Sequence, residues 1–185
     1  MKTYQRDNGD LGAKLKLRKY FLEKYHVRTP PRVFDCCQGE GKIWSTLREE
    51  FQTAEYWGVD KKPKKGRLNI DSLRVLGQTG WEADVVDIDT YGSPWKHWVA
   101  MLPNIRGPLT VFLTVGQWLM GTDRAMLDAL GVGSLNLPPG LAVKLHDTGI
   151  NCLLAKAHDF SLELTEIQGC RSRFSHGRYI GVRIG

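Results

Sequence analysis

The chain has 185 residues, of which 42% are hydrophobic, and it carries a formal net charge of +6 at pH 7. This length suits one domain with a full core, since domains usually have about 100 to 200 residues. The longest apolar runs are far shorter than the roughly 20 residues of a membrane span, and the polar start is no signal peptide. We therefore expect a cytoplasmic protein that contacts no membrane. The basic charge favours an acidic partner such as nucleic acid, although solubility alone also explains a mildly basic surface.

The four cysteines predict neither a disulfide framework nor a metal site. Cys36 and Cys37 are neighbours in one expected strand and cannot easily bond each other, and Cys152 and Cys170 lack the paired spacing of metal ligands. We expect reduced, buried thiols and no bound metal.

The N-terminal region divides into a polar start and a basic helix. Residues 1–12 are expected to be flexible, and residues 13–185 to form a single domain. Within residues 13–25, apolar side chains recur at helical spacing with lysines between them, and the helix should end before Pro30. Its basic face suits contact with phosphates, but a solvated face is the more usual explanation.

Strands and helices alternate after this helix. The expected strands are residues 32–37, 56–59, 67–70, 84–88 and 109–114, and the expected helices are residues 42–51, 72–76, 96–102, 123–130 and 141–154. This order is typical of a parallel sheet. Residues 161–167 and 178–184 instead alternate apolar with polar or glycine residues, which predicts an antiparallel pair joined by a connection over residues 168–177.

Residues 33–41, V-F-D-C-C-Q-G-E-G, are the stretch that most strongly indicates a ligand site. An apolar strand runs through Asp35 into a turn with Gly39 and Gly41, and a helix follows. Glycines let the backbone approach a ligand closely, and the helix N-terminus adds N–H donors at the strand's carboxyl end. The pattern predicts a nucleotide-like ligand in this turn.

Acidic residues stand at the ends of most of the expected parallel strands: Asp35, Asp60, Asp71, and Asp87 with Asp89. Asp60 follows the glycine turn by about twenty residues, which is the spacing of an acid that binds the hydroxyls of a ribose. Asp35 and Glu40 would repel phosphates, so the site favours an adenosine with a positive centre over a pyrophosphate.

The stretch 33–41 resembles the first motif of class I S-adenosylmethionine-dependent methyltransferases, with Asp35, Gly39 and Gly41 at the motif's acidic and glycine positions. The resemblance implies a Rossmann-like methyltransferase fold: an α/β structure with a mostly parallel seven-stranded sheet, an antiparallel C-terminal strand pair and helices on both faces. It also implies S-adenosylmethionine as cofactor. The residues that it places at the cofactor are Asp35, Cys37, Gly39, Gly41, Asp60 as the ribose acid, Asp71 near the adenine, and Asp87. Cys37 stands where the family usually has glycine, and its side chain narrows the approach to the cofactor's methionine part.

Residues 89–94, D-T-Y-G-S-P, indicate the substrate. They resemble the Asp-Pro-Pro-Tyr motif of nucleic-acid amino methyltransferases and, more closely, the Asp-Pro-Phe-Gly-Ser-Pro type of tRNA guanosine N2 methyltransferases, with Thr90 at the proline position. The resemblance gives catalytic roles to Asp89, which orients an exocyclic amine, and to Tyr91, which stacks on the base. The substrate contacts that we infer around them are Ser93, Pro94, Trp95 and Trp118. A plain strand-to-helix turn capped by Asp89 or Ser93 is the alternative.

We therefore expect a methyltransferase (EC 2.1.1) that uses S-adenosylmethionine to methylate an exocyclic amine of a nucleobase in RNA or DNA. Two alternatives stay open. One is methylation of a small molecule or a protein, and the other is a non-catalytic relative that binds nucleic acid or a partner protein, for which Cys37 and Thr90 are the motivating departures.

Overall fold

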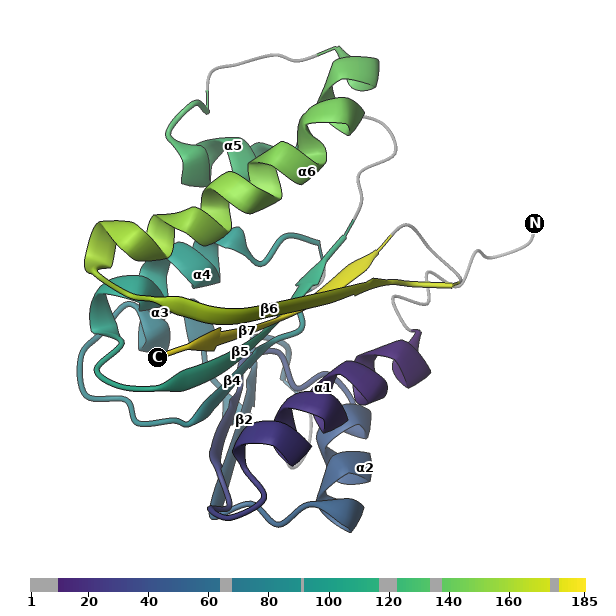
Figure 1. Cartoon of the computed structure of the whole chain (residues 1–185), viewed down its shortest axis with the longest axis vertical. Coiled ribbons are helices and arrows are strands. Elements are labelled where there is room, and N and C mark those ends of the chain that lie inside the picture. The colour runs from purple at the N-terminus through teal and green to yellow at the C-terminus, as the bar shows by residue number, and fades with distance from the viewer. Residues whose placement is uncertain (1–9, 64–67, 91, 117–122, 134–137, 174–176) are drawn as a thin grey trace.

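The structure is a computed structural model that describes residues 10–63, 68–90, 92–116, 123–133, 138–173 and 177–185 (Figure 1). Its centre is a seven-stranded sheet with strand order β3-β2-β1-β4-β5-β7-β6. The strands are β1 Arg32–Asp35, β2 Glu55–Asp60, β3 Leu68–Asn69, β4 Val85–Ile88, β5 Leu109–Val115, β6 Leu164–Arg171 and β7 Arg178–Ile184. The strands β1 to β5 pair in parallel, whereas β7 is antiparallel to both β5 and β6. The expected mostly parallel sheet with an antiparallel C-terminal pair is confirmed.

Helices cover both faces of this sheet. The helices are α1 Leu11–Tyr25, α2 Lys42–Glu50, α3 Ser72–Leu76, α4 Trp95–Met101, α5 Arg124–Leu130 and α6 Pro139–Ala155, with 3-10 turns η1 Leu102–Asn104 and η2 Lys156–Phe160. Figure 1 shows α1 and α2 together on one side and α4, α5 and α6 on the other. Each side has its own hydrophobic cluster, because successive strand residues point to opposite faces. Phe112 belongs to the α1 side, for example, and Leu113 to the α4 side.

Several boundaries differ from the expected ones for local reasons. The helix α1 begins at Leu11, because the Asp10 carboxylate accepts a hydrogen bond from the Ala13 N–H at 3.0 Å and caps the helix. Residues 1–9 lie outside the described part. The strand β1 ends at Asp35 rather than at residue 37, since the glycine turn begins there.

The largest difference concerns the C-terminal strand pair. The strand β6 spans Leu164–Arg171 instead of residues 161–167, because η2 extends the preceding helix and Ser161 adopts a left-handed φ of 58° that ends it. Gln168 therefore lies within β6. The connection between the last two strands, expected over residues 168–177, begins only after Arg171. Cys152, which was expected to be buried, is exposed, and all four cysteines are unpaired thiols.

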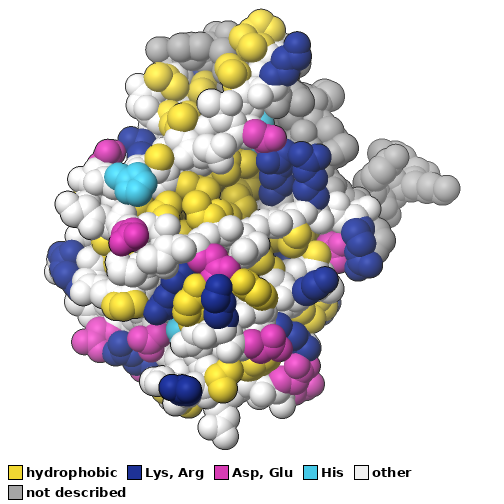
Figure 2. Space-filling view, viewed as in Figure 1, with side chains coloured by type: hydrophobic (Ala, Val, Ile, Leu, Met, Phe, Trp, Pro, Cys, Tyr) yellow, Lys and Arg dark blue, Asp and Glu magenta, His cyan; other side chains and the backbone are white. Residues whose placement is uncertain are grey.

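The surface in the view of Figure 2 carries hydrophobic side chains gathered between α6 and β6, and basic side chains interspersed with acidic ones. Exposed apolar residues on these two elements include Leu141, Leu145 and Ile167. Within the described residues, no helix combines the length and apolarity that crossing a bilayer requires.

Candidate functional site

The carboxyl ends of β1, β2 and β4 bring four of the predicted acids to one edge of the sheet. Asp35 is paired in register with Asp87 on β4 and with Gly58 on β2, which places Asp60 two residues further along the same edge. Parallel strands present their ends together, so this arrangement follows directly from the topology. The predicted gathering of acids is present, but the structure gives the individual acids different surroundings.

The glycine turn has the backbone geometry that glycine permits. Gly39 and Gly41 have φ values of 54° and 71°, in the left-handed region, and Gly41 precedes the first residue of α2. The Gly39 N–H donates to Asp60 Oδ2 at 3.0 Å, and Asp60 Oδ1 accepts the Lys62 N–H at 2.8 Å. Asp60 thereby fixes the backbone of the glycine turn from the end of β2. The predicted turn and ribose acid therefore lie in direct contact.

Asp35 is buried, and its surroundings favour the neutral carboxyl group. Its side chain accepts a hydrogen bond from the Tyr56 hydroxyl at 2.8 Å and a long one from the Cys37 N–H at 3.4 Å. Burial, together with the negative charge of neighbouring Asp87, raises the pKa of Asp35 to about 8. At neutral pH this carboxyl group is therefore largely protonated in the cofactor-free protein.

Asp87, which we expected to bind the cofactor, is instead part of a buried ion pair. Its Oδ1 accepts from Arg18 Nη2 at 2.6 Å, and its Oδ2 accepts from Arg18 Nε at 2.7 Å and from Trp44 Nε1 at 2.8 Å. Both side chains of the pair are 1% exposed. The carboxylate faces α1 and α2, because alternate residues of β4 point to opposite faces, and the structure assigns it to the core.

Asp89 directly follows the last residue of β4 and is partly exposed. Its two carboxylate oxygens are 2.6 and 2.7 Å from Lys14 Nζ, and its side chain is 19% exposed. Neither Asp89 nor Ser93 caps α4 with its side chain, because the residue at the N-cap is Pro94, which makes no capping bond. The simple helix-cap interpretation of the motif is therefore wrong.

The remainder of the motif is packed into the sheet edge. The Gly116 N–H, after β5, donates to the Gly92 carbonyl at 2.7 Å and ties the motif loop to the next strand. Pro94 and Trp95 are buried, and Trp95 is 0% exposed, so Trp95 packs in the core at the start of α4. Tyr91 and Trp118, predicted as base platform and substrate contact, lie outside the described residues.

A second group of polar residues lies beside the glycine turn. Asp71 caps α3 by accepting the Leu73 N–H at 3.0 Å, and its other oxygen is 3.1 Å from Lys61 Nζ. The next residue, Ser72, is 3.1 Å from His97 Nε2 on α4. Burial lowers the pKa of His97 to about 4, so that its ring is neutral at pH 7.

Cys37 has the properties of an inert thiol. Burial, together with the charges of nearby carboxylates, raises its pKa to about 12, so it is not a thiolate at neutral pH.

Several buried polar atoms near this edge make no hydrogen bond within the described structure. They are Gln38 Oε1 in the glycine turn, Thr90 Oγ1 and Ser93 Oγ in the motif loop, and His97 Nδ1 on α4. Buried polar atoms are normally hydrogen-bonded, so such a concentration is typical of a site that binds a polar ligand. Acids, glycine turn and unpartnered atoms thus gather at the carboxyl ends of the strands, where parallel sheets bind their ligands.

The residues that sequence reasoning missed come mainly from α1. The basic face of this helix was expected to be solvated or to contact phosphates, yet Lys14 and Arg18 are 4% and 1% exposed and bind Asp89 and Asp87. A signal was present, because both residues share a helix face with Phe21, which is 0% exposed. Tyr56 and Trp44, which donate to Asp35 and Asp87, were also not predicted as part of the site.

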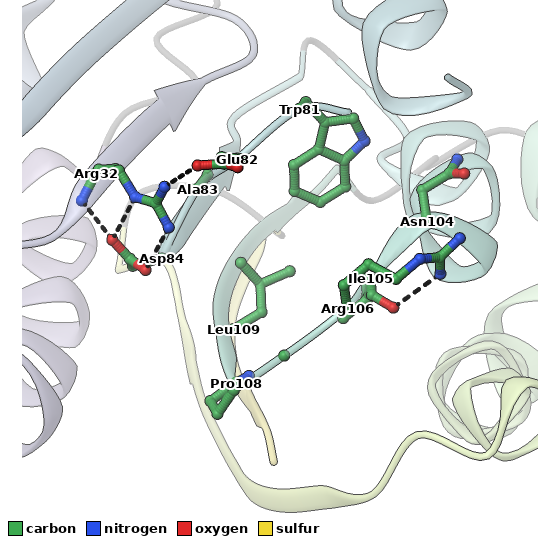
Figure 3. A pocket seen from close by; sticks show the side chains of 11 residues that line it. Arg32, Trp81, Glu82, Ala83, Asp84, Asn104, Ile105, Arg106, Pro108 and Leu109 are labelled. Atoms are coloured by element: carbon green, nitrogen blue, oxygen red, sulfur yellow. Dashed lines mark hydrogen bonds and ion pairs between the residues drawn. The ribbon is translucent and has the colours of Figure 1, made fainter. Parts of the chain in front are cut away.

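A separate cavity of about 320 Å³ lies at the opposite edge of the sheet (Figure 3). Trp81 and Leu109 line it together with Arg32, whose guanidinium pairs with Glu82 and Asp84. Arg32 and Leu109 begin β1 and β5, so this cavity lies at the amino ends of the strands. Ligands of open parallel sheets bind at the carboxyl ends, and we keep the candidate site there. Among the described residues, no group of His, Cys, Asp or Glu side chains has the arrangement of a metal site.

Comparisons with known proteins give a result at the level of structure only. The sequence matches no protein-family model, and no curated protein sequence is significantly similar to it. Trm1 from Pyrococcus horikoshii, solved with S-adenosyl-L-methionine, has a TM-score of 0.60 and 18% identity, with 97% of this chain and 55% of that chain covered. The chain thus spans little more than half of that protein.

Two other solved structures match with similar quality. TYW2 from M. jannaschii, in complex with AdoMet, has a TM-score of 0.55 and 11% identity and covers 99% of this chain and 77% of that chain. The magnesium protoporphyrin IX methyltransferase ChlM from Synechocystis PCC 6803, with bound SAH, has a TM-score of 0.54 and 12% identity and covers 100% and 89%. Strand order, glycine turn and these matches agree: the chain has the fold of class I S-adenosylmethionine-dependent methyltransferases.

Proposed function

We propose that the protein is an S-adenosylmethionine-dependent methyltransferase whose acceptor is an exocyclic amine of a nucleobase in RNA or DNA. The observation that carries this proposal is the position of Asp89. It stands on the same sheet edge as the glycine turn and Asp60, and it stays 19% exposed while Asp87, two residues earlier, is 1% exposed. Asp89 is thus a partly exposed carboxylate at the same end of the sheet as the glycine turn.

The cofactor would be held by residues that already lie together. Asp60 would bind the ribose hydroxyls next to Gly39, whose N–H it also accepts. Asp71, and His97, which contacts the neighbouring Ser72, would border the adenine. Asp35 would face the positively charged end of the cofactor, where a cation favours its ionised form. Gln38 Oε1 adds an acceptor that has no partner in the described structure.

Methyl transfer to an amine depends more on the alignment of the acceptor nitrogen with the methyl group than on acid–base catalysis. The bound cofactor supplies a methyl group on a positively charged sulfur, which becomes a thioether when its carbon–sulfur bond breaks. Asp89 would accept an N–H of the acceptor amine and aim the nitrogen lone pair that forms the new bond, and the released proton passes to Asp89 or water. Tyr91 would stack on the base, a contact worth about 1 to 3 kcal/mol. The protonated state of Cys37 argues against a mechanism through a thiolate.

Two alternatives have their own support. ChlM and the plantazolicin methyltransferase BamL share the fold, and their names give small-molecule substrates, which favours the small-molecule alternative. Cys37, in the position where the family has glycine, favours a non-catalytic relative, since its side chain fills space beside the turn. The nucleobase acceptor rests on the motif of residues 89–94, and the basic net charge of +6 agrees with it.

The test uses cofactor carrying a labelled methyl group, incubated with the purified protein and with tRNA, DNA, protein or metabolite fractions. We expect label in tRNA or DNA. We also expect Asp89→Ala to lower the rate of methyl transfer by at least about 100-fold. Asp159→Ala, an exposed acid in η2, is the matched control and should transfer label normally. Label only in protein or metabolites would overturn the nucleobase acceptor. A protein that transfers no label and shows no thermal shift with S-adenosylhomocysteine would be the non-catalytic relative.

A further inference from the structure

The ion pair between Lys14 and Asp89 connects the N-terminal helix to the proposed acceptor site. Lys14 lies in the first turn of α1, and its Nζ is 2.6 and 2.7 Å from the two oxygens of Asp89. The side chain of Lys14 is 5% exposed and that of Asp89 is 19% exposed. The side chain of Lys14 is therefore more completely buried than that of Asp89, and part of the Asp89 side chain remains open to solvent.

Lys14 is itself held by neighbours on β7 and on its own helix. Its ammonium lies 5.3 Å from the ring centroid of Tyr179 on β7, within the range of a cation–π contact. The Tyr179 hydroxyl accepts the Asp10 N–H at 3.2 Å, and Asp10 caps α1. One turn later, Arg18 donates from Nη1 to the Lys14 carbonyl at 3.1 Å while it binds Asp87. These contacts fix the backbone and the side chain of Lys14, so the position of the ammonium is set by the core.

The geometry leaves room on Asp89 for a second donor. An ammonium that donates to both oxygens uses one acceptor position on each, and each oxygen of a carboxylate has two. The exposed part of Asp89 can therefore accept an N–H while Lys14 stays in place. A latch that blocked the acceptor would cover the Asp89 carboxylate, whereas the Asp89 side chain stays 19% exposed with Lys14 bound to it.

We propose that Lys14 is a positioning residue of the acceptor site, which holds the Asp89 carboxylate in the orientation that receives the acceptor amine. This role rests on the proposed methyl transfer. A carboxylate without this contact can rotate, and a displacement of about 1 Å of a reacting group costs about 100-fold in rate. In this proposal, helix α1 contributes Lys14 to the acceptor site in addition to packing against the sheet.

The test compares Lys14→Met, which keeps the apolar stem without the charge, with Lys14→Arg, which keeps the charge. The matched control is Lys19→Met, on the same helix, where Lys19 makes an exposed pair with Glu50. We expect Lys14→Met to lower kcat about 100-fold and to leave the affinity for S-adenosylhomocysteine, measured by calorimetry, unchanged. Lys14→Arg should recover a large part of kcat, and Lys19→Met should match the wild type.

A double variant separates positioning from a purely structural role. If Lys14 acts through Asp89, then Lys14→Met combined with Asp89→Asn should be no slower than Asp89→Asn alone. In the cofactor-free protein, urea unfolding should show the same coupling, because both single variants remove one ion pair. Rate losses that multiply, or a Lys14→Met protein with normal kcat per folded molecule, would overturn the role of Lys14 alone. A wild-type protein that transfers no label would instead overturn the methyl transfer and, with it, this role.

Discussion

Arg18 grips both carboxylate oxygens of Asp87, with Nη2 2.6 Å from Oδ1 and Nε 2.7 Å from Oδ2, in a pair whose two side chains are each 1% exposed. Trp44 Nε1 donates to the same carboxylate at 2.8 Å, and the guanidinium lies 5.0 Å from the ring centroid of Phe112. The pair joins α1 to β4 across the face that carries the smaller hydrophobic cluster. Helix α1 is thereby locked to the strand from which Asp89 follows.

Arg18→Met is expected to destabilise the protein by about 3 to 5 kcal/mol, because it leaves the Asp87 carboxylate buried without a partner. The double variant Arg18→Met with Asp87→Leu should be markedly more stable than Arg18→Met, since it buries no charge. Urea unfolding measures both. Lys19→Met, in an exposed pair with side chains 31% and 50% exposed, should cost less than about 1 kcal/mol. Equal costs for the buried and the exposed pair would show that the Arg18–Asp87 contact is not formed.

The raised pKa of Asp35 should make the free energy of unfolding depend on pH. Its pKa in the folded protein is about 8, above its ordinary value of 3.8, so the folded protein binds more protons than the unfolded chain between these pH values. The free energy of unfolding should therefore be highest below pH 3.8, as far as this group is concerned, and should fall as pH rises to about 8. One proton gives a slope of at most about 1.4 kcal/mol per pH unit.

Asp35→Asn isolates this contribution. Asparagine keeps an oxygen that accepts the Tyr56 hydroxyl, but it does not ionise. Urea unfolding at several pH values should show the variant gaining on the wild type as pH increases through this window. Identical slopes for the two proteins would mean that Asp35 is ionised in the folded state at neutral pH.

A substitution at Gly116 tests the contact between β5 and the loop of residues 89–94. A Cβ at this position would lie 2.9 Å from the Gly92 carbonyl oxygen, which also accepts the Gly116 N–H at 2.7 Å. Gly116→Ala should push the two segments apart, cost about 1 to 3 kcal/mol and lower methyl transfer through displacement of Asp89. Differential scanning calorimetry and the labelling assay measure the two effects. Gly107→Ala, where a Cβ has no neighbour within 4 Å, is the control, and an equally mild result at Gly116 would argue against the contact.

Local signals were sufficient to predict much of the fold. Helix α3 and strand β7 were predicted to the residue, since Asp71 caps the former and alternation runs through the whole of the latter. The glycine turn also followed from residue type and spacing, whereas the hydrogen bond from Gly39 to Asp60 was not predicted. Strand β6 was misplaced because a 3-10 turn and the left-handed Ser161 intervene, and neither has a strong sequence signature.

The surroundings of the acids could not be predicted in the same way. Asp35, Asp87 and Asp89 all follow or end buried strands, and their spacing alone does not distinguish a ligand-binding acid from a core acid. The distinction depends on α1, whose Lys14 and Arg18 lie 75 and 69 residues before their partners. Pairs so far apart in sequence form through tertiary packing, and a lysine-rich helix is normally solvated.

In the proposed function, the glycine turn and Asp60 bind the nucleoside of S-adenosylmethionine. Isothermal titration calorimetry of the wild-type protein with S-adenosylhomocysteine tests this binding most directly. We expect binding by the wild type and a loss of affinity of at least about 10-fold in Asp60→Ala, because hydrogen bonds to a charged group are worth about 1.5 to 3 kcal/mol. Absence of binding by the wild type, or an unchanged affinity in Asp60→Ala, would contradict the account.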